Sequence, residues 1–231
     1  MGDAGGSEVN RSNAIECLRA SALDATCSLE LATLLSRAFT DERHVTAFSG
    51  ERAEAWLPHV ARVQAADPLD HELMPQSFLD AFPTLRNARR PAPERREGLH
   101  FVLCFEGYLA THVSLWAQEF TFAGERVRGG YIEDVATDPL CLGRGFASQA
   151  MRAAEMEARA LGLDVLGLAT EIGPCYERLG WRTRDGHHTM TIGEHSFPDE
   201  PLMLLPLTPP GERLTAGSGD MQSERLPRFR D

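Results

Sequence analysis

Residues 142–147, Leu-Gly-Arg-Gly-Phe-Ala, place two glycines just before an expected helix and could bind an anion. Glycine lets the backbone approach a ligand closely, and the first N–H groups of a helix point outward at its positive end. An ordinary strand-to-helix turn fits the same residues, so this hexapeptide alone leaves both interpretations open. The glycine spacing matches neither a Walker loop nor a dinucleotide fingerprint. Two adjacent carboxylates, Glu133 and Asp134, precede this loop and could accept protons or bind a cation.

The elements that must position these residues follow from the apolar pattern. Residues 131–137 predict a strand that Asp138 and Pro139 end, because proline cannot donate to a ladder. A helix is expected to begin near Arg144, since alanines and other apolar residues recur at spacings of three, four and seven up to Leu161. Residues 164–170 predict a second buried strand. A short helix closed by a glycine follows in residues 174–181.

This order of motifs resembles the GNAT superfamily of acetyl-CoA-dependent N-acetyltransferases. In that family a strand is followed by [Q/R]-x-x-G-x-[G/A] opening a helix, then by a strand and a short helix ending in Y-x-x-x-G-[F/W]. Gly145 and Ala147 fit the loop, and residues 176–181 (Tyr-Glu-Arg-Leu-Gly-Trp) fit the second motif; Leu142 stands where the family has Gln or Arg. The resemblance implies an α+β GNAT fold, with a mixed, mostly antiparallel central sheet flanked by helices. It also implies acetyl-CoA as co-substrate and no metal.

Within the superfamily, residues 130–181 are most similar to the aminoglycoside 2′-N-acetyltransferases, which carry GY-[VI]-E-x-V before the loop and end in YxxxGW. This resemblance implies that Glu133 is the base, acting through water, and that Tyr176 is the acid. It implies cofactor contacts by two segments: Val135, Ala136, Thr137, and then Leu142, Gly143, Arg144, Gly145, Phe146, Ala147 and Ser148. The expected substrate-binding carboxylates are Asp41, Glu133, Asp134 and Glu171.

Three functions remain open from the sequence. The first is acetyl transfer to an aminoglycoside antibiotic, at a 2′-amino group or on a kasugamycin-type amino sugar, giving resistance. The second is a GNAT enzyme acting on another small amine, an amino acid or a protein N-terminus, because loops decide acceptor choice. The third is a non-catalytic acyl-CoA sensor, which is disfavoured because it would not need both Glu133 and Tyr176.

The composition is that of an ordinary globular protein of 231 residues with 34 acidic and 23 basic residues, a net charge of -11. This charge disfavours nucleic acid as a partner and favours a small cationic amine, although solubility alone also explains it. Five scattered cysteines predict reduced thiols and a cytoplasmic protein. No apolar run reaches the length of about 18 residues that a membrane span needs. Adjacent His187 and His188 would face opposite sides of a strand, which disfavours a shared metal site.

The chain is expected to form one GNAT domain over residues 13–207, after a disordered N-terminus at 1–12 and before a flexible tail at 208–231. Its first elements are a strand at 13–20 and a helix at 28–39. An insertion at about 41–98, with a helix at 51–64, is either a substrate lid or a decoration. Further strands are predicted at 99–104, 108–116, 120–122, 127–137 and, as the last one, 202–207. A homodimer is one option for the oligomeric state.

Overall fold

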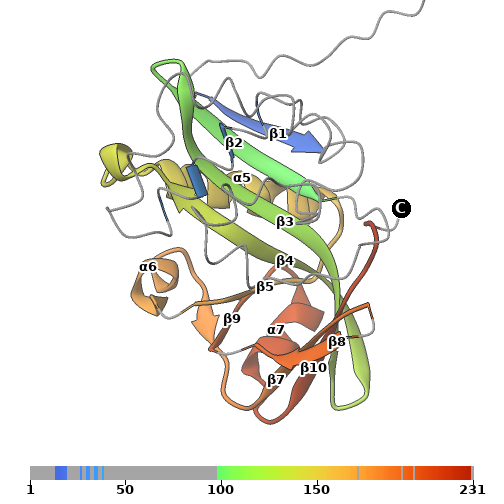
Figure 1. Cartoon of the computed structure of the whole chain (residues 1–231). Coiled ribbons are helices and arrows are strands. Elements are labelled where there is room, and N and C mark those ends of the chain that lie inside the picture. Colours follow the sequence, from blue (N-terminus) through green and yellow to red (C-terminus); the bar gives the residue numbers. More distant parts are fainter. Residues whose placement is uncertain are drawn as a thin grey trace, which may run out of the picture. The chain divides into compact units, whose positions relative to one another are not determined.

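The computed structural model describes residues 14–19, 27, 30, 31, 34, 35, 38, 98–170, 172–193, 195–199 and 201–229 (Figure 1). The insertion up to residue 97, with its predicted helix, lies outside the described residues. The chain forms two compact units. The first comprises residues 1–95, 100–112 and 134–150, and the second comprises residues 96–99, 113–133 and 151–231. Strands β3 and β4 and helix α5 contribute residues to both units.

The first unit contains the predicted opening strand, β1 (Ile15–Arg19), and residues 100–112 of the hairpin that β2 (Leu99–Phe105) and β3 (Tyr108–Phe122) form. Glu106 and Gly107 form the hairpin turn in the left-handed region, with φ of 51° and 86°. The six described residues between 27 and 38 are all helical, in agreement with the helix predicted at 28–39. An apolar core joins this helix to the hairpin and to the end of β4: Leu34, Val102, Cys104, Leu109 and Ala136.

The second unit is built on a mixed sheet in the order β6-β9-β5-β4-β3-β10-β7-β8. Neighbouring strands are parallel in the pairs β4–β5 and β10–β7, and antiparallel in the pairs β5–β9, β6–β9, β7–β8 and β10–β3. This mixed, mostly antiparallel arrangement confirms the predicted α+β fold class. The element bounds are β4 Glu125–Thr137, α5 Phe146–Ala160, β5 Val165–Ala169, α6 Gly173–Glu177, β6 Arg182–Thr183, β7 His188–Ile192, β8 His195–Pro198, β9 Leu202–Pro206, α7 Pro209–Ala216 and β10 Met221–Arg225.

Phe120 lies at the centre of the second unit's apolar core and is fully buried. Two glycines make room for its ring, because a Cβ on Gly129 would stand 2.5 Å from Phe120 Cε2 and one on Gly167 2.7 Å from its Cζ. Burying a side chain of this size contributes roughly 1.5–3 kcal/mol. Glycines in β4 and β5 therefore fix how closely these two strands pack on the core.

The prediction of a flexible tail from residue 208 is wrong. Residues 209–216 form α7, which packs against β9 and β5, and residues 221–225 form β10 (red in Figure 1). Strand β10 pairs with β3 and β7, with Arg225 opposite Gln118, so β9 is not the last strand. Burial alternates along β10, but two of its three buried positions are the polar Ser223 and Arg225. A search for apolar periodicity cannot detect such a strand.

Two further differences are local. Strands β7 and β8 form a hairpin that the sequence did not predict. Helix α5 begins at Phe146 instead of near Arg144, because Gly143 and Gly145 have φ of 76° and 78°, which a right-handed helix cannot contain. The helix therefore begins directly after the second glycine.

Candidate active site

The glycine loop ends in a helix terminus that is suited to an anion. Gln149 N donates to Gly145 O at 3.1 Å, so the N–H groups of residues 146–148 come before the first intrahelical bond. Residues 142–145 are exposed, and within the described part of the chain no atom beyond the two chain neighbours lies within 4 Å of where a Cβ on Gly143 or Gly145 would stand. The open backbone and the positive helix end fit a phosphate group.

Side chains around the loop hold it by ring contacts. The Arg144 guanidinium carbon lies 4.7 Å from the centre of the Phe105 ring, and the Phe146 ring centre lies 5.4 Å from the same ring. Leu142 is 66% exposed, and among the described residues no ring contact involves it. Asp138 caps the preceding 3-10 turn (Pro139–Cys141) by accepting from Leu140 N at 2.9 Å.

The end of β4 carries the other predicted cofactor residues. Pairing with β5 ends at Tyr131 opposite Gly167, so residues 132–137 continue beyond the last β4–β5 pair. Ala136 is buried and its carbonyl accepts from Thr111 Oγ1 at 2.6 Å, while Val135 and Thr137 are half-buried. The backbone at these positions is thus held on the β3 side.

Asp134 interrupts the regular strand, because its φ is 53°. Its carbonyl oxygen accepts from His112 Nδ1 at 2.9 Å, and His112 Nε2 lies 2.9 Å from His100 Nδ1. Burial lowers the pKa of His100 to about 4, and burial followed by the neighbouring His100 lowers that of His112 to about 3. A neutral, buried histidine pair therefore supports the irregular backbone at Asp134.

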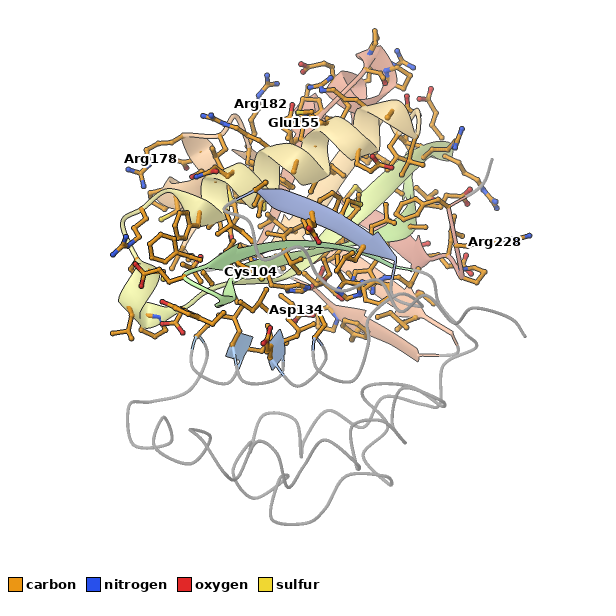
Figure 2. The ribbon with its side chains drawn as sticks, turned by 90° about the horizontal axis from the view of Figure 1, so that it is seen from above. Cys104, Asp134, Glu155, Arg178, Arg182 and Arg228 are labelled. Carbon is orange, nitrogen blue, oxygen red and sulfur yellow. The ribbon has the colours of Figure 1, made fainter. Side chains whose placement is uncertain are left out.

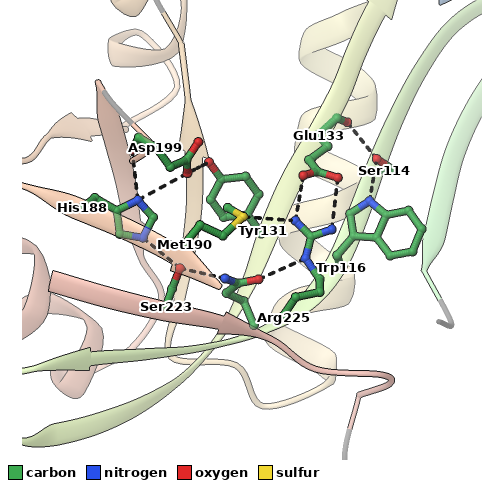
Figure 3. A network of polar contacts seen from close by, with 10 residues as sticks. Ser114, Trp116, Tyr131, Glu133, His188, Met190, Asp199, Ser223 and Arg225 are labelled. Carbon is green, nitrogen blue, oxygen red and sulfur yellow. Dashed lines mark hydrogen bonds and ion pairs between the residues drawn. The ribbon is translucent and has the colours of Figure 1, made fainter. Parts of the chain in front are cut away.

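Glu133 forms a bidentate ion pair with Arg225 of β10 (Figure 3). Arg225 Nη2 lies 2.7 Å from Glu133 Oε1, and Nη1 lies 3.1 Å from Oε2. Only 2% of the Arg225 side chain is exposed, against 18% for Glu133. The guanidinium lies 5.5 Å and 5.6 Å from the ring centres of Trp116 and Tyr131. Fork geometry of this kind is the strong form of a charged hydrogen bond.

The ion pair continues into a polar network across β3, β10, β7 and the end of β8 (Figure 3). Arg225 Nε donates to Gln118 Oε1 at 3.1 Å, and Gln118 Nε2 donates to Ser223 Oγ at 2.7 Å. His188 Nε2 lies 2.8 Å from Ser223 Oγ, and His188 Nδ1 lies 3.0 Å from the Asp199 carbonyl oxygen and 3.3 Å from Asp199 Oδ2. The Tyr131 hydroxyl donates to the same carboxylate oxygen of Asp199.

Tyr176 lies on α6 and is half-buried, with its ring edge-on to that of buried Trp181 at 6.2 Å between centres. Burial, and then the neighbouring Cys175, raises the pKa of the Tyr176 hydroxyl. The phenol therefore keeps its proton at neutral pH, as a general acid must.

The two predicted substrate carboxylates Asp41 and Glu171 lie outside the described residues. The structure places Glu133 and Tyr176 in the second unit, and residues 134–137 and 142–148 in the first. Sequence analysis missed the network partners of Glu133, which are Tyr131, Gln118, His188, Asp199, Ser223 and Arg225. The local indication of these partners is that burial alternates along β10, and this alternation is seen only once the structure is known.

The described residues contain no group of three or more His, Cys, Asp or Glu side chains that could hold a metal ion. Nor does any helix among them have the length and apolar character to cross a membrane. On the surface beside α5, the side chains of Arg178 and Arg182 extend outward near Glu155 (Figure 2). Arg178 and Glu155 also line a shallow pocket with Trp181.

Residues 70–184 match the family model described as an acetyltransferase (GNAT) domain. No curated protein matches the chain in sequence. Among solved structures, Eis1 from Mycobacterium abscessus is 17% identical, with a TM-score of 0.36, over 37% of this chain and 23% of its own. Two longer alignments are with GNAT enzymes of similar size. YhbS from Escherichia coli, solved with CoA, gives 14% identity, a TM-score of 0.48, and covers 93% of this chain and 92% of its own.

The second, a GNAT family acetyltransferase from Brucella melitensis solved with acetyl-CoA, gives 15% identity, a TM-score of 0.46, and covers 91% and 96% of the two chains. The chain spans less than a quarter of Eis1, and 34% and 32% of two other matched structures. Taken with the mixed sheet and the loop geometry, the family match over residues 70–184 supports the predicted superfamily: this chain carries a GNAT acetyltransferase domain.

Proposed function

We propose that this protein transfers the acetyl group of acetyl-CoA to an amine of an aminoglycoside antibiotic, and so gives resistance. The acetylated group is a 2′-amine, or alternatively an amine of a kasugamycin-type amino sugar. The observation that carries a catalytic function is Tyr176, a half-buried phenol whose pKa is raised by burial, in the motif that follows the glycine loop. A protein that only senses acyl-CoA would need no such proton donor.

Acetyl-CoA is the donor, and its pyrophosphate lies on residues 142–148 at the start of α5. Two left-handed glycines and the open space beside them support this assignment, since a ligand can approach the backbone there. The acetyl-pantetheine arm runs along residues 135–137, beyond the last β4–β5 pair. Two matched GNAT structures were solved with CoA and with acetyl-CoA.

In the proposed reaction, the amine nitrogen attacks the thioester carbon, so that a C–N bond forms while the C–S bond breaks. Glu133 accepts the proton of the amine through a water molecule, and Tyr176 gives its proton to the departing thiolate. Arg225 holds both oxygens of Glu133 and so fixes the orientation of this carboxylate. The backbone of Val135 and Thr137 polarises the carbonyl.

The net charge of -11 supports a polycationic acceptor, because the protein's field attracts it. The same feature fits a small amine of another kind or a protein N-terminus, which remains the alternative acceptor. Asp41, Asp134 and Glu171 stay proposed acceptor carboxylates. The proposal places the protein in the cytoplasm, where acetyl-CoA is available, without nucleic acid or membrane as partner and with a homodimer as one option.

The test is thiol release from acetyl-CoA by the purified protein with tobramycin, gentamicin and kasugamycin, followed by mass measurement of the product. We expect acceptor-dependent release and a mass increase of one acetyl group on compounds that bear a 2′-amine. Analogues that lack this amine serve as the control. Release that is equal with and without every amine would contradict the proposal.

A further inference from the structure

The directions of the hydrogen bonds that Gln118 makes follow from Arg225, which can only donate. Arg225 has no acceptor atom, so Gln118 must present its oxygen to Arg225 Nε and its NH₂ group to Ser223 Oγ. A backbone carbonyl can only accept, so His188 carries a proton on Nδ1 toward the Asp199 carbonyl. His188 Nε2 shares a hydrogen bond with Ser223 Oγ, which also accepts from Gln118. The bonds from Arg225 to Gln118 and from Gln118 to Ser223 both point away from Arg225.

Among the described residues, Arg184 Nη2 is the one buried side-chain nitrogen or oxygen without a partner, and it lies outside this network. Reversing the Gln118 amide would point its NH₂ group at the Nε–H donor of Arg225. The orientation of Gln118 is therefore fixed by its two partners.

The two carboxylates of the network have different partners. Glu133 forms a bidentate pair with Arg225. The Asp199 carboxylate accepts from the Tyr131 hydroxyl and lies 3.3 Å from His188 Nδ1. Burial, and then the charge of Asp199, raises the pKa of Tyr131 far above its ordinary value, so the phenol stays a donor. Within the described residues, Asp199 is therefore the carboxylate of this network that no arginine pairs with.

The Asp199 side chain is also partly exposed to solvent, and Tyr131 and His188 contact it. Its side chain is 16% exposed, while the His188 side chain that contacts it is 1% exposed. Tyr131 and Glu133 are two residues apart on β4 and so face the same side of the strand. The Tyr131 hydroxyl thus brings Asp199 to the same face as the carboxylate proposed as base (Figure 3).

We propose that Asp199 binds an ammonium group of the acceptor, with Tyr131 and His188 as positioning residues that hold its carboxylate. A primary ammonium offers three donors, and a carboxylate that accepts from the Tyr131 hydroxyl has lone pairs left for one of them. This inference rests on the proposed function and adds the anchor for the acceptor. It selects molecules with a second cationic amine beside the one that is acetylated, because the anchored ammonium keeps its proton.

The test uses the full chain with a saturating concentration of CoA and measures binding of two probes, tobramycin and spermidine, by calorimetry. The variant Asp199→Asn keeps the shape and removes the charge. We expect both probes to bind about 10-fold or more weakly, since a hydrogen bond to a charged group is stronger than one between neutral groups. Asp220→Asn removes the same charge at an exposed position and should leave binding unchanged.

A second variant, Tyr131→Phe, removes one hydrogen bond without changing charge, and we expect a smaller loss of affinity for the probes with unchanged affinity for acetyl-CoA. Equal probe binding by the wild type and Asp199→Asn would overturn the inference, as would a wild type that binds neither probe. Loss of spermidine binding in Asp199→Asn, in a protein that acetylates no aminoglycoside, would retain the anchor and reject the proposed acceptor.

Discussion

The glycine loop at residues 142–148 and the polar network around Arg225 are built in opposite ways. The loop offers backbone N–H groups and left-handed glycines from one short stretch of sequence. The network joins side chains that are far apart along the chain, such as Gln118 and Arg225 at 107 residues. A site made of backbone groups can therefore be predicted from local sequence. A site made of side chains from distant strands cannot, because it depends on how the strands are paired.

The network also corrects the interpretation of Glu133. From the sequence it is a strand carboxylate whose partners are unknown. In the structure it is one half of a buried ion pair whose other half lies on β10, in the segment expected to be flexible. Any role in proton transfer must be performed by a carboxylate that already binds a guanidinium. The difference between the two regions suggests that the loop binds the donor and that the network serves the acceptor.

The largest expected effect concerns the stability of the network. Glu133→Gln leaves the buried Arg225 cation without its counter-ion, which should lower the free energy of unfolding by about 3–5 kcal/mol. Arg182→Met breaks an exposed pair with Glu212 and should cost less than about 1 kcal/mol. Urea denaturation of both variants measures the contrast. Equal losses would mean that the network is no more structural than a surface ion pair.

Tyr176→Phe should reduce kcat about 100-fold, because the thiolate loses its proton donor, while the KM for acetyl-CoA stays nearly unchanged. Thiol release with tobramycin as acceptor measures it. Tyr108→Phe removes a phenol of the first unit that hydrogen-bonds Cys141 and is the matched control. A kcat within a factor of about two of the wild type would remove Tyr176 from the reaction.

The buried histidine pair predicts a loss of stability in acid. The folded pKa values of His100 and His112, about 4 and about 3, lie below the ordinary value of 6.5. As pH falls below 6.5, the unfolded chain binds protons before the folded one does. Stability is thus full above about pH 7 and falls by about 1.4 kcal/mol per pH unit for each histidine between the two pKa values.

Urea denaturation at pH 7.5 and pH 5.0 should therefore differ by about 2 kcal/mol for each histidine, or about 4 kcal/mol for the pair. His100→Gln removes one of the titrating groups and should give a shallower dependence on pH. If His100→Gln and the wild type lose the same free energy over this range, other groups cause the acid sensitivity.

The smallest effect is expected in the loop. Gly145→Ala places a Cβ on a residue with φ of 78°, in the space assigned to the pyrophosphate, and should raise the KM for acetyl-CoA about 10-fold. Gly124→Ala introduces the same strain at a φ of 81° in the β3–β4 turn. A rise in KM for both variants would trace the effect to folding instead of the loop.

Much of the fold was predictable because its core elements carry regular apolar patterns. Strands β1, β2, β4, β5 and β9 and helices α5 and α6 were expected close to where they lie, whereas β3 was expected as two strands, at 108–116 and 120–122. Strand β10 was not, because Ser223 and Arg225 occupy inward positions where the pattern demands apolar residues. The family motif indicated Gly145 and Tyr176 because both lie in short, continuous stretches of sequence. It could not indicate Asp199, because the neighbours of this residue come from β4 and β7.

We assign the donor to the glycine loop and the acceptor to the polar network. The most direct test of this assignment is a pair of kinetic titrations on Gly145→Ala and Asp199→Asn, each with acetyl-CoA and tobramycin varied in turn. Gly145→Ala should raise the KM for acetyl-CoA alone, and Asp199→Asn should raise the KM for tobramycin alone, each by about 10-fold. If both variants raise the same KM, or if Asp199→Asn leaves the KM for tobramycin unchanged, the assignment of donor and acceptor to these two regions is wrong.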